Sequence, residues 1–242
     1  MSKNNQKIAI VLPAYNEARV IGQVLDELPR KITVSGKSYG ILIIVVDDGS
    51  TDSTSSVVKQ RKDVILIRHL LQSGAGAATR TGLHHAASIG CNYALTMDSD
   101  GQHSTKDVTR LINEIVKSQA DFIIGSRLKQ PSGNMPTVKK VGNIGLSVIT
   151  FLLLGVYVSD TQSGLKALNS KALSKIDFHS NDYAFCSEMI WKAHQAKLKI
   201  EELPIKSIYT DYSVSKGQNN ITGAIDIIKQ LVKRRFLHLI NG

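Results

Sequence analysis

The chain has 242 residues, of which 42% are hydrophobic and 21% are charged. This length and composition suit one α/β domain with a substantial buried core, and they exclude a largely disordered chain. The formal net charge of +10 indicates an anionic partner, which could be nucleic acid, a lipid headgroup surface or a phosphorylated substrate.

The first half of the chain alternates apolar runs with amphipathic stretches. Residues 1–7 are polar and contain no secretory signal peptide, so we expect the site to face the cytoplasm. Asn16 is expected to cap a first helix that Pro29 stops. Strands are predicted over Ile8–Leu12, Ile41–Val46, Val64–Arg68, Tyr93–Met97 and Phe122–Ile124, and helices over Ser53–Gln60, Ala77–Ile89 and Lys106–Lys117. Repeated βα units predict a mostly parallel sheet with helices on both faces and ligands at the carboxyl ends of its strands.

The second half is less regular. Residues 130–140 contain two prolines and a glycine and predict a loop. Val141–Ser159 is uncharged over 19 residues and predicts a buried or interfacial helix, with a membrane span as the alternative. A helix is predicted over Ser187–Ala196, and short strands over Lys199–Leu203 and Ser207–Tyr212. Since no repeat or linker interrupts the pattern, we expect residues 1–242 to form a single domain.

Residues 221–242 predict a basic amphipathic helix. Its expected apolar face consists of Ile221, Ile225, Ile228, Val232, Phe236 and Leu239. Such a helix either lies on an anionic membrane or packs on the domain with a solvated basic face. The two cysteines, Cys91 and Cys186, have no metal-ligand spacing, so free thiols in a reducing compartment are expected.

Polar turns follow the first two predicted strands. These turns are PAYNE, which is Pro13–Glu17, and DDGSTD, which is Asp47–Asp52. A carboxylate at a strand end can accept hydrogen bonds from a base or ribose, and an exposed aromatic ring can lie against a base. Capping of the next helix would explain residues 50–52, but it leaves Asp47 and Asp48 unexplained.

MDSDGQH follows the fourth predicted strand. Asp98 and Asp100, two residues apart at a strand end, form a hard oxygen site suited to Mg²⁺ or Mn²⁺, and Gln102 can add a neutral oxygen. Such an ion would stabilise the charge on a departing diphosphate. A D-x-D triplet is common by chance as a surface cap, and its position after a predicted parallel strand is what favours the metal site. The glycine-rich residues 72–82 match neither a dinucleotide fingerprint nor a P-loop.

Five motifs occur in one order along the chain: PAYNE, VVDDGSTD, MDSDGQH, GSR and DTQSGLKAL. In this order and at these spacings they resemble the family 2 inverting glycosyltransferases of the GT-A fold, whose Rossmann-like sheet is mostly parallel with helices on both faces. The resemblance covers about residues 8–216 and is greatest to the dolichol-phosphate or polyprenol-phosphate mannosyltransferase group. Thr210 and Tyr212 stand where some of these relatives have arginines, which weakens the assignment to the mannosyl branch.

The resemblance implies a role for each matching residue. The donor, a GDP- or UDP-hexose, would be bound through its base and ribose by Pro13, Tyr15, Glu17 and Asp48. The metal ion, Mg²⁺ or Mn²⁺, and the diphosphate would be held by Asp98, Asp100 and Gln102. The phosphate of a polyprenyl or dolichyl phosphate acceptor would be bound by Arg127, Lys139 and Asn143. Lys139 replaces an arginine of the relatives and is therefore a point charge rather than a bidentate fork.

Asp160 of DTQSG leaves two functions open. The resemblance implies that Asp100, Arg127 and Asp160 are catalytic. With a lipid phosphate as acceptor, Asp160 would position groups, because a phosphate monoester is already anionic at neutral pH. With a saccharide hydroxyl as acceptor, in cell-envelope polysaccharide synthesis, Asp160 would be the general base.

Several expectations concern the surroundings of this site. His103 is expected to cap the loop after the metal site, and Glu188 has either a structural or a catalytic role. A membrane span over Val141–Ser159 would separate Asp98 from Asp160, so this segment should stay on the domain, at the cytoplasmic face of a membrane. Nucleic acid is not expected as a partner, because only 5% of residues are aromatic and no nucleic-acid module is present.

Overall fold

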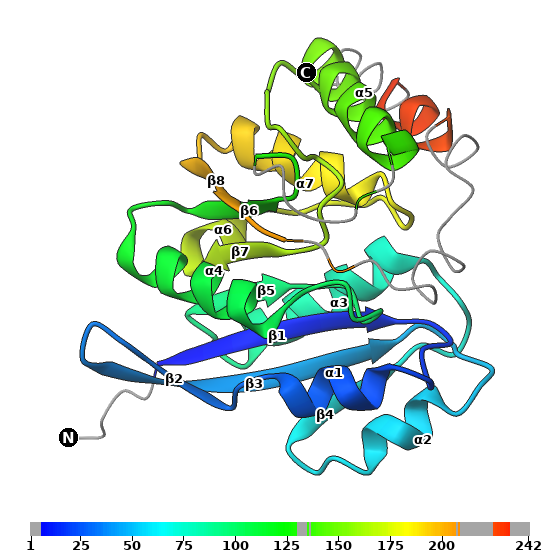
Figure 1. Cartoon of the computed structure of the whole chain (residues 1–242), viewed down its shortest axis with the longest axis vertical. Helices are drawn as coiled ribbons and strands as arrows, with labels where there is room; N and C mark the ends of the chain where they lie inside the picture. Colours follow the sequence, from blue (N-terminus) through cyan, green and yellow to red (C-terminus); the bar gives the residue numbers. More distant parts are fainter. Residues whose placement is uncertain (1–5, 130–134, 136, 207, 209–224, 233–242) are drawn as a thin grey trace.

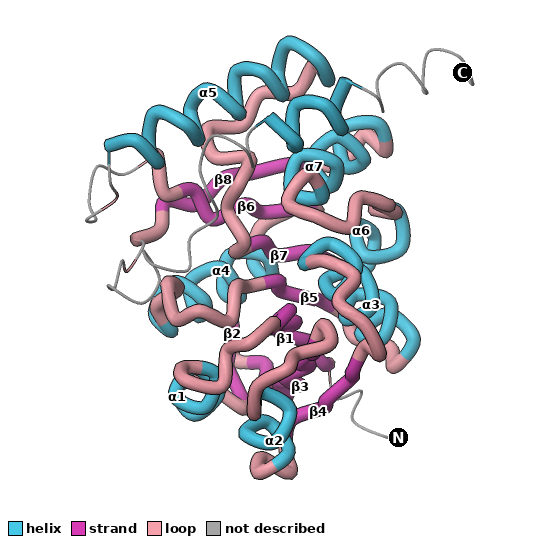
Figure 2. The backbone as a smooth tube through the Cα atoms, turned by 90° about the vertical axis from the view of Figure 1, so that its right-hand side faces the viewer, coloured by secondary structure: helices cyan, strands magenta, loops and turns pink. Residues whose placement is uncertain are grey.

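The computed structural model describes residues 6–129, 135, 137–206, 208 and 225–232. Within these residues, eight strands form one sheet with helices on both sides (Figure 1, Figure 2). The strands are β1 (Lys7–Ala14), β2 (Lys31–Val34), β3 (Lys37–Asp47), β4 (Val64–Arg68), β5 (Tyr93–Thr96), β6 (Phe122–Ser126), β7 (Lys166–Asn169) and β8 (Ile200–Pro204). The helices are α1 (Ile21–Glu27), α2 (Thr54–Lys59), α3 (Ala75–Ser88), α4 (Thr105–Lys117), α5 (Thr137–Leu154), α6 (Ser170–Lys175) and α7 (Phe185–Gln195).

The central strands are apolar at consecutive positions because both faces of the sheet are covered. Ile8 and Ile10 of β1 pack in a cluster with residues of α1, α2 and α4. Ala9 and Val11, which point the other way, pack in a cluster with residues of α3, α6 and α7. Figure 2 shows α1 and α4 on one side of the sheet and α3, α6 and α7 on the other. The expected two-sided α/β architecture is therefore confirmed.

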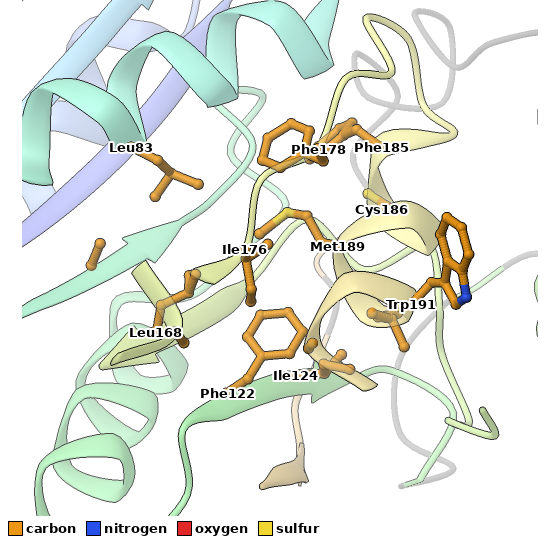
Figure 3. Packing of buried hydrophobic residues seen from close by; sticks show 14 of the residues in the cluster. Leu83, Phe122, Ile124, Leu168, Ile176, Phe178, Phe185, Cys186, Met189 and Trp191 are labelled. Atoms are coloured by element: carbon orange, nitrogen blue, oxygen red, sulfur yellow. The ribbon is translucent and has the colours of Figure 1, made fainter. Parts of the chain in front are cut away.

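The core beside α7 is rich in aromatic residues. Figure 3 shows Phe178 and Phe185 next to each other, with Met189 and Cys186 on the same helix as Phe185. The ring centroids of Phe178 and Phe185 are 5.6 Å apart. Cys91 and Cys186 are both buried free thiols, as the sequence predicts.

The sheet contains antiparallel strands that the patterns above do not predict. Its order is β2-β3-β1-β5-β7-β6-β8, and β4 also pairs with β3. β1 is parallel to β3 and β5, but β2 pairs antiparallel with β3, and β7 is antiparallel to both β5 and β6. Ser35 and Gly36 form the turn of the β2–β3 hairpin with φ of 50° and 76°, so the Ser-Gly dipeptide was the missed signal.

β7 decides which segments can reach the functional edge of the sheet. Because β7 runs antiparallel between β5 and β6, its first residue lies at the edge where β5 and β6 end. The segment that precedes β7, Asp160–Leu165, therefore lies beside the residues that follow β5 and β6. This strand has only four residues, and the sequence pattern did not distinguish it from a loop.

α5 differs from the predicted helix at both ends. It begins at Thr137, so residues 137–140 are helical and the expected loop is wrong there, while residues 130–134 and 136 lie outside the described part. It ends at Leu154, because Gly155 takes a φ of 74° and stops the helix.

α5 has one face on the domain. Only four of its 18 residues are buried: Leu146, Ser147, Thr150 and Leu154. The Ser147 hydroxyl accepts from the Thr161 N–H at 3.2 Å, and the hydroxyls of Thr150 and Ser187 lie 3.3 Å apart. By length and composition α5 could cross a membrane, but these bonds at its middle attach it along one side to the domain.

The described part of the C-terminal segment packs on the domain. Residues 225–232 are helical, and their buried side chains are Ile227 and Leu231. Ile225 is 46% exposed, so the expected apolar face, which contained Ile225, is rotated in the structure. Residues 221–224 and 233–242 of the expected helix, and most of the predicted strand 207–212, lie outside the described residues.

Asp121 precedes β6, at the edge of the sheet opposite to the one where β5 and β6 end, and it binds residues next to β8, in β7 and in α6. Its carboxylate accepts from the Lys199 N–H at 3.0 Å, from the Asn169 amide at 3.0 Å and from the Lys171 ammonium at 2.8 Å. Burial acts to raise the pKa of Asp121, but these donors outweigh it and lower the pKa to about 2. The ionised carboxylate therefore stabilises the fold.

We expect Asp121→Asn to lower the free energy of unfolding at pH 7 by about 1–3 kcal/mol. The folded-state pKa lies below the unfolded value of about 3.9, so this contribution is present above about pH 4 and is lost as the pH falls toward 2. Urea denaturation of the wild type and the variant at pH 7 and pH 2 measures it. A difference in stability that persists unchanged at pH 2 would contradict the assignment.

Candidate active site

The candidate site residues gather at one edge of the sheet. Tyr15 follows β1, Asp48 follows β3, Asp98 follows β5 and Arg127 follows β6, and these four strands point the same way. Asp160 joins them from the segment before the antiparallel β7. The candidate residues therefore lie at the carboxyl ends of the parallel strands, with Asp160 beside them.

The two turns after β1 and β3 bind each other. The Asn16 side-chain oxygen accepts from the Thr51 N–H at 2.9 Å, and the Asn16 N–H donates to the Ser50 hydroxyl at 2.9 Å. The Glu17 N–H donates to the Thr54 hydroxyl at 2.8 Å. Asn16 has a φ of 54° and lies well before α1, so the expectation that it caps this helix is wrong. These bonds leave Tyr15 37% exposed between the turns, while Glu17 is buried.

Asp47 and Asp48 both have structural partners. Asp47 accepts from the Ser50 N–H at 3.0 Å and from the Ser55 hydroxyl. Asp48 accepts from the N–H groups of Ser73 and Gly74 at 3.0 and 2.7 Å, and its Oδ1 lies 2.7 Å from His69 Nδ1. Capping of α2 does not account for these two aspartates, and they instead order the turn after β3 and the loop before α3.

Asp98 and Asp100 form a pair of carboxylates after β5. Between them, the Ser99 hydroxyl donates to the Pro13 carbonyl at 2.8 Å, which ties this turn to the one after β1. The Asp100 carboxylate accepts from the Gln102 N–H at 3.0 Å. Burial and the negative charge of Asp98 raise the pKa of Asp100 to about 6. For Asp98, burial acts to raise the pKa, but the hydrogen bond with His103 and nearby positive charges lower it.

This pair fits a small divalent cation. Two neighbouring carboxylates repel each other, and an ion with charge +2 would relieve the repulsion that raises the pKa of Asp100. Mg²⁺ commonly binds through one or two carboxylates together with substrate phosphates, so a third acidic ligand is not required. Within the described residues, no group of three or more His, Cys, Asp or Glu side chains has an arrangement that could hold a metal ion by itself.

His103 and Tyr183 lie near the carboxylate pair. The His103 side chain is 1% exposed, and its Nε2 lies 3.3 Å from Asp98 Oδ2. The next residue, Ser104, caps α4 by accepting from the Asp107 N–H. Burial raises the pKa of Tyr183 to about 12, and the charges of Asp98 and Asp100 add to the rise, so this half-exposed ring lies near the pair. No motif in the sequence marks Tyr183.

Arg127 and Asp160 form a buried bidentate ion pair. Arg127 Nε donates to Asp160 Oδ2 at 2.7 Å, and Arg127 Nη2 donates to Asp160 Oδ1 at 2.8 Å. The Arg127 N–H also donates to Oδ2, at 3.0 Å. The two side chains are 11% and 0% exposed. Burial acts to raise the pKa of Asp160, but the charge and hydrogen bonds of Arg127 outweigh it and lower the pKa.

A polar network holds the backbone next to Asp160. The hydroxyl oxygens of Ser126 and Ser159 lie 2.6 Å apart, and Ser159 donates to Glu202 of β8 through both its N–H and its hydroxyl. Lys129 forms an ion pair with the same Glu202 at 3.3 Å. No local pattern connects Ser126, Ser159 and Glu202, because they come from three separate segments of the chain.

Lys139 and Asn143 lie one turn apart on the half-buried side of α5. Ser147, one turn further along, donates to the Ser159 carbonyl at 3.1 Å, next to Asp160. The three residues therefore share the face of α5 that is turned toward the segment carrying Asp160.

Glu188 has structural partners in the fold. Its two carboxylate oxygens accept from the N–H groups of His179 and Ser180 at 3.1 and 2.8 Å. The carbonyl of the next residue, Asn181, accepts from the Gly76 N–H at 2.7 Å. Glu188 thus orders a loop that packs against the start of α3. Of the structural and the catalytic role expected from the sequence, these contacts support the structural one.

Similar proteins occur in several organisms. UDP-N-acetylglucosamine–dolichyl-phosphate N-acetylglucosaminyltransferase of Methanococcus voltae is 40% identical over 236 residues, which cover 89% of this chain and 91% of that protein. Polyprenol monophosphomannose synthase of Mycolicibacterium smegmatis is 29% identical over 226 residues, which cover 87% of this chain and 81% of that protein.

A solved structure supports the same fold. Glucosyl-3-phosphoglycerate synthase of Mycobacterium tuberculosis, in complex with UDP, matches with a TM-score of 0.71 and 19% identity, over 95% of this chain and 80% of that one. The family model described as glycosyl transferase family 2 matches residues 9–177, which is well over half of the chain. The protein, with its GT-A fold, therefore belongs to glycosyl transferase family 2 and is a glycosyltransferase.

Proposed function

We propose that the protein transfers a sugar from a nucleoside diphosphate donor to a polyprenyl or dolichyl phosphate, with inversion at the anomeric carbon. The names of the relatives support this acceptor class, and the 40% identical relative extends the expected hexose donors to UDP-N-acetylglucosamine. Either a hexose or an N-acetylhexosamine is therefore considered as the transferred group.

The donor would bind over the turns after β1, β3 and β5. Tyr15 would lie against the base, and Pro13, Glu17 and Asp48 would line the base and ribose. Asp98, Asp100 and the side-chain oxygen of Gln102 would hold Mg²⁺ or Mn²⁺ together with the diphosphate. When bound, such an ion would neutralise the diphosphate and stabilise the charge it carries as it leaves.

The observation that carries the choice of acceptor is the Arg127–Asp160 pair. Asp160 is fully buried, its two oxygens accept three N–H bonds from Arg127, and its pKa is lowered. A general base must take a proton from its substrate, and this carboxylate is poorly placed to do so. A phosphate monoester has its second pKa near 6 and needs no base at neutral pH. The pair therefore favours a phosphate acceptor over a saccharide hydroxyl.

The transfer then needs positioning more than proton movement. Arg127 is held in place by its two side-chain hydrogen bonds to Asp160, and its guanidinium would orient the acceptor phosphate. Lys139 and Asn143 would bind the same phosphate from α5. A phosphate oxygen attacks the anomeric carbon as the bond from that carbon to the diphosphate breaks. The bonding electrons leave with the nucleoside diphosphate, and in-line attack inverts the configuration.

The exposed side of α5 would lie on the cytoplasmic face of a membrane, near the lipid acceptor. Five of its exposed apolar residues are Val141, Ile144, Val148, Phe151 and Leu152. The formal charge of +10 favours an anionic surface. Peripheral binding of this kind leaves the attached face of α5 on the domain.

The proposal is tested by incubating the protein with labelled UDP-N-acetylglucosamine, UDP-glucose or GDP-mannose and a short-chain polyprenyl phosphate. Each donor is used with Mg²⁺, with Mn²⁺ and with EDTA. Label that enters the organic phase only with metal supports the proposal and identifies the donor. Hydrolysis of the sugar nucleotide without labelled lipid would contradict the lipid-phosphate acceptor and favour a hydroxyl acceptor.

We expect Lys139→Ala to raise the apparent KM for the polyprenyl phosphate by about tenfold or more, because a hydrogen bond to a charged group contributes about 1.5–3 kcal/mol. The KM for the sugar nucleotide should change little. Lys140→Ala, the exposed neighbour on α5, is the matched control and should leave both values unchanged. Equal effects on the two substrates would count against an acceptor role for Lys139.

We expect Leu152→Asp to weaken binding to vesicles of phosphatidylcholine and phosphatidylglycerol by about tenfold or more, since burying a leucine contributes about 1.5–3 kcal/mol. Leu152 is 73% exposed on α5, so the fold should be unaffected. Leu70→Asp is the control, because Leu70 is 99% exposed but lies in the loop after β4. Sedimentation with vesicles measures both. Equal binding by the two variants would contradict a membrane contact through α5.

A further inference from the structure

Lys166 is a fully buried lysine at the centre of the sheet. It is the first residue of β7, and its register partners are Thr96 of β5 and Ile124 of β6. Figure 2 shows β7 between β5, the strand that leads to Asp98, and β6, the strand that leads to Arg127. Within the described residues Lys166 forms no ion pair with a carboxylate, although an unpaired buried charge is costly. Since the buried charge of Lys166 is costly, we expect it to have a function in the site.

The ammonium of Lys166 binds the segment that precedes it. Its Nζ donates to the carbonyl oxygen of Ser163 and lies 5.9 Å from the centroid of the Phe185 ring. Burial raises the pKa of the neighbouring Cys186 thiol, and the charge of Lys166 opposes that rise. The lysine thus closes the turn Asp160–Leu165 onto the sheet.

This turn touches both halves of the candidate active site. At its start, Asp160 binds Arg127, which we propose orients the acceptor phosphate. Near its end, Gly164 lies against Asp98: a Cβ atom on Gly164 would be 2.2 Å from Asp98 Oδ2. The Gly164 carbonyl also accepts from the Thr96 hydroxyl at 2.8 Å. The turn is therefore the spacer between the carboxylate pair and the Arg127–Asp160 pair.

We propose that Lys166 is a positioning residue, whose buried ammonium fixes the Asp160–Leu165 turn and so sets Asp98 and the Arg127–Asp160 pair at the separation that sugar transfer requires. This inference rests on the proposed function, because it assumes that donor and acceptor are held on the two sides of the turn.

Electrostatics supports the same role. Burial acts to raise the pKa values of Asp98 and Asp160, and both are nevertheless lowered. His103 and Arg127 contribute most to this lowering, and the charge of Lys166 adds to it for both carboxylates. The positive charge of Lys166 thus stabilises both Asp98 and Asp160, which lie on the two sides of the turn.

Lys166→Met is the first test variant, because methionine has a similar length and no charge. We expect its melting temperature to stay close to that of the wild type, because the variant removes the desolvation cost of a buried charge together with the attraction of that charge to Asp98 and Asp160. Misplacement of two reacting groups by about 1 Å can cost about 100-fold in rate, and we expect kcat to fall by about that factor. The calorimetric affinity for UDP with Mn²⁺ and the donor KM should change little.

Three further variants sharpen the test. Lys166→Arg keeps the charge and should restore part of kcat. Gly164→Ala would displace the same turn, because the added methyl group meets Asp98. The double variant Gly164→Ala with Lys166→Met should therefore lose less kcat than the two single losses combined. Lys175→Met, at an exposed lysine of α6, should match the wild type.

A folded Lys166→Met protein with wild-type kcat would overturn the inference. So would a loss of stability in both Lys166 variants with unchanged kcat per folded molecule, because the role would then be structural only. A wild-type protein that transfers no sugar to any polyprenyl phosphate would refute the proposed function, and the inference with it. The first two outcomes leave the proposed function intact, so the two failures are distinguishable.

Discussion

Asp100→Asn is expected to reduce metal-dependent sugar transfer by about 10³-fold or more while the protein stays folded. An amide has the shape of the carboxylate but lacks the charge that would attract a divalent cation. The raised pKa of Asp100, about 6, arises from burial and from the charge of Asp98, so the two anions repel each other in the metal-free protein. Removing one of them should leave the metal-free stability unchanged or higher.

Two measurements check this expectation. Calorimetric titration with Mn²⁺ and UDP should show weakened binding by the variant, and a thermal melt should show an unchanged or higher midpoint. Asp177→Asn is the matched control, because the side chain of Asp177 is 64% exposed and lies away from the carboxylate pair. Full metal-dependent transfer by Asp100→Asn would refute the assignment of the metal site.

Breaking the Arg127–Asp160 pair is expected to have the largest effect on stability. Arg127→Met removes the positive charge that neutralises the fully buried Asp160, and Asp160→Leu removes the carboxylate that neutralises the largely buried guanidinium. Each single change should lower the free energy of unfolding by about 3–5 kcal/mol, because an uncompensated buried charge remains. The double variant removes both charges and should recover most of that loss.

Urea denaturation at pH 7 completes the double-mutant cycle. Lys199→Met serves as the comparison, because its ion pair with Glu201 is exposed and should contribute only about 0–1 kcal/mol. We expect all three variants of the buried pair to lose transfer to polyprenyl phosphate, including the stable double variant. If the two single losses of stability add up in the double variant, the two side chains are not coupled. If the double variant still transfers sugar to polyprenyl phosphate, the assignment of Arg127 to the acceptor site is refuted.

The sequence predicted where the candidate residues gather better than it predicted the elements around them. The motifs after β1, β3, β5 and β6 all lie at one edge, because the carboxyl ends of parallel strands meet there. The role of Asn16 was predicted wrongly, because a cap and a bridge between two turns use the same side-chain oxygen. The C-terminal helix was correct in type over residues 225–232 and wrong in phase, because several faces of a short apolar helix are nearly equivalent until one of them packs.

Local chemistry indicated which residues are candidates for the site, and long-range packing determined how they are arranged. Apolar runs that end in paired carboxylates or Gly-Ser-Arg specify buried strands with functional ends, since buried strands and polar turns demand these residue types. Only the tertiary structure placed four-residue β7 antiparallel between β5 and β6, because its pairing depends on neighbours distant in the chain. That placement brings Asp160 to Arg127 and buries Lys166, neither of which local sequence can encode.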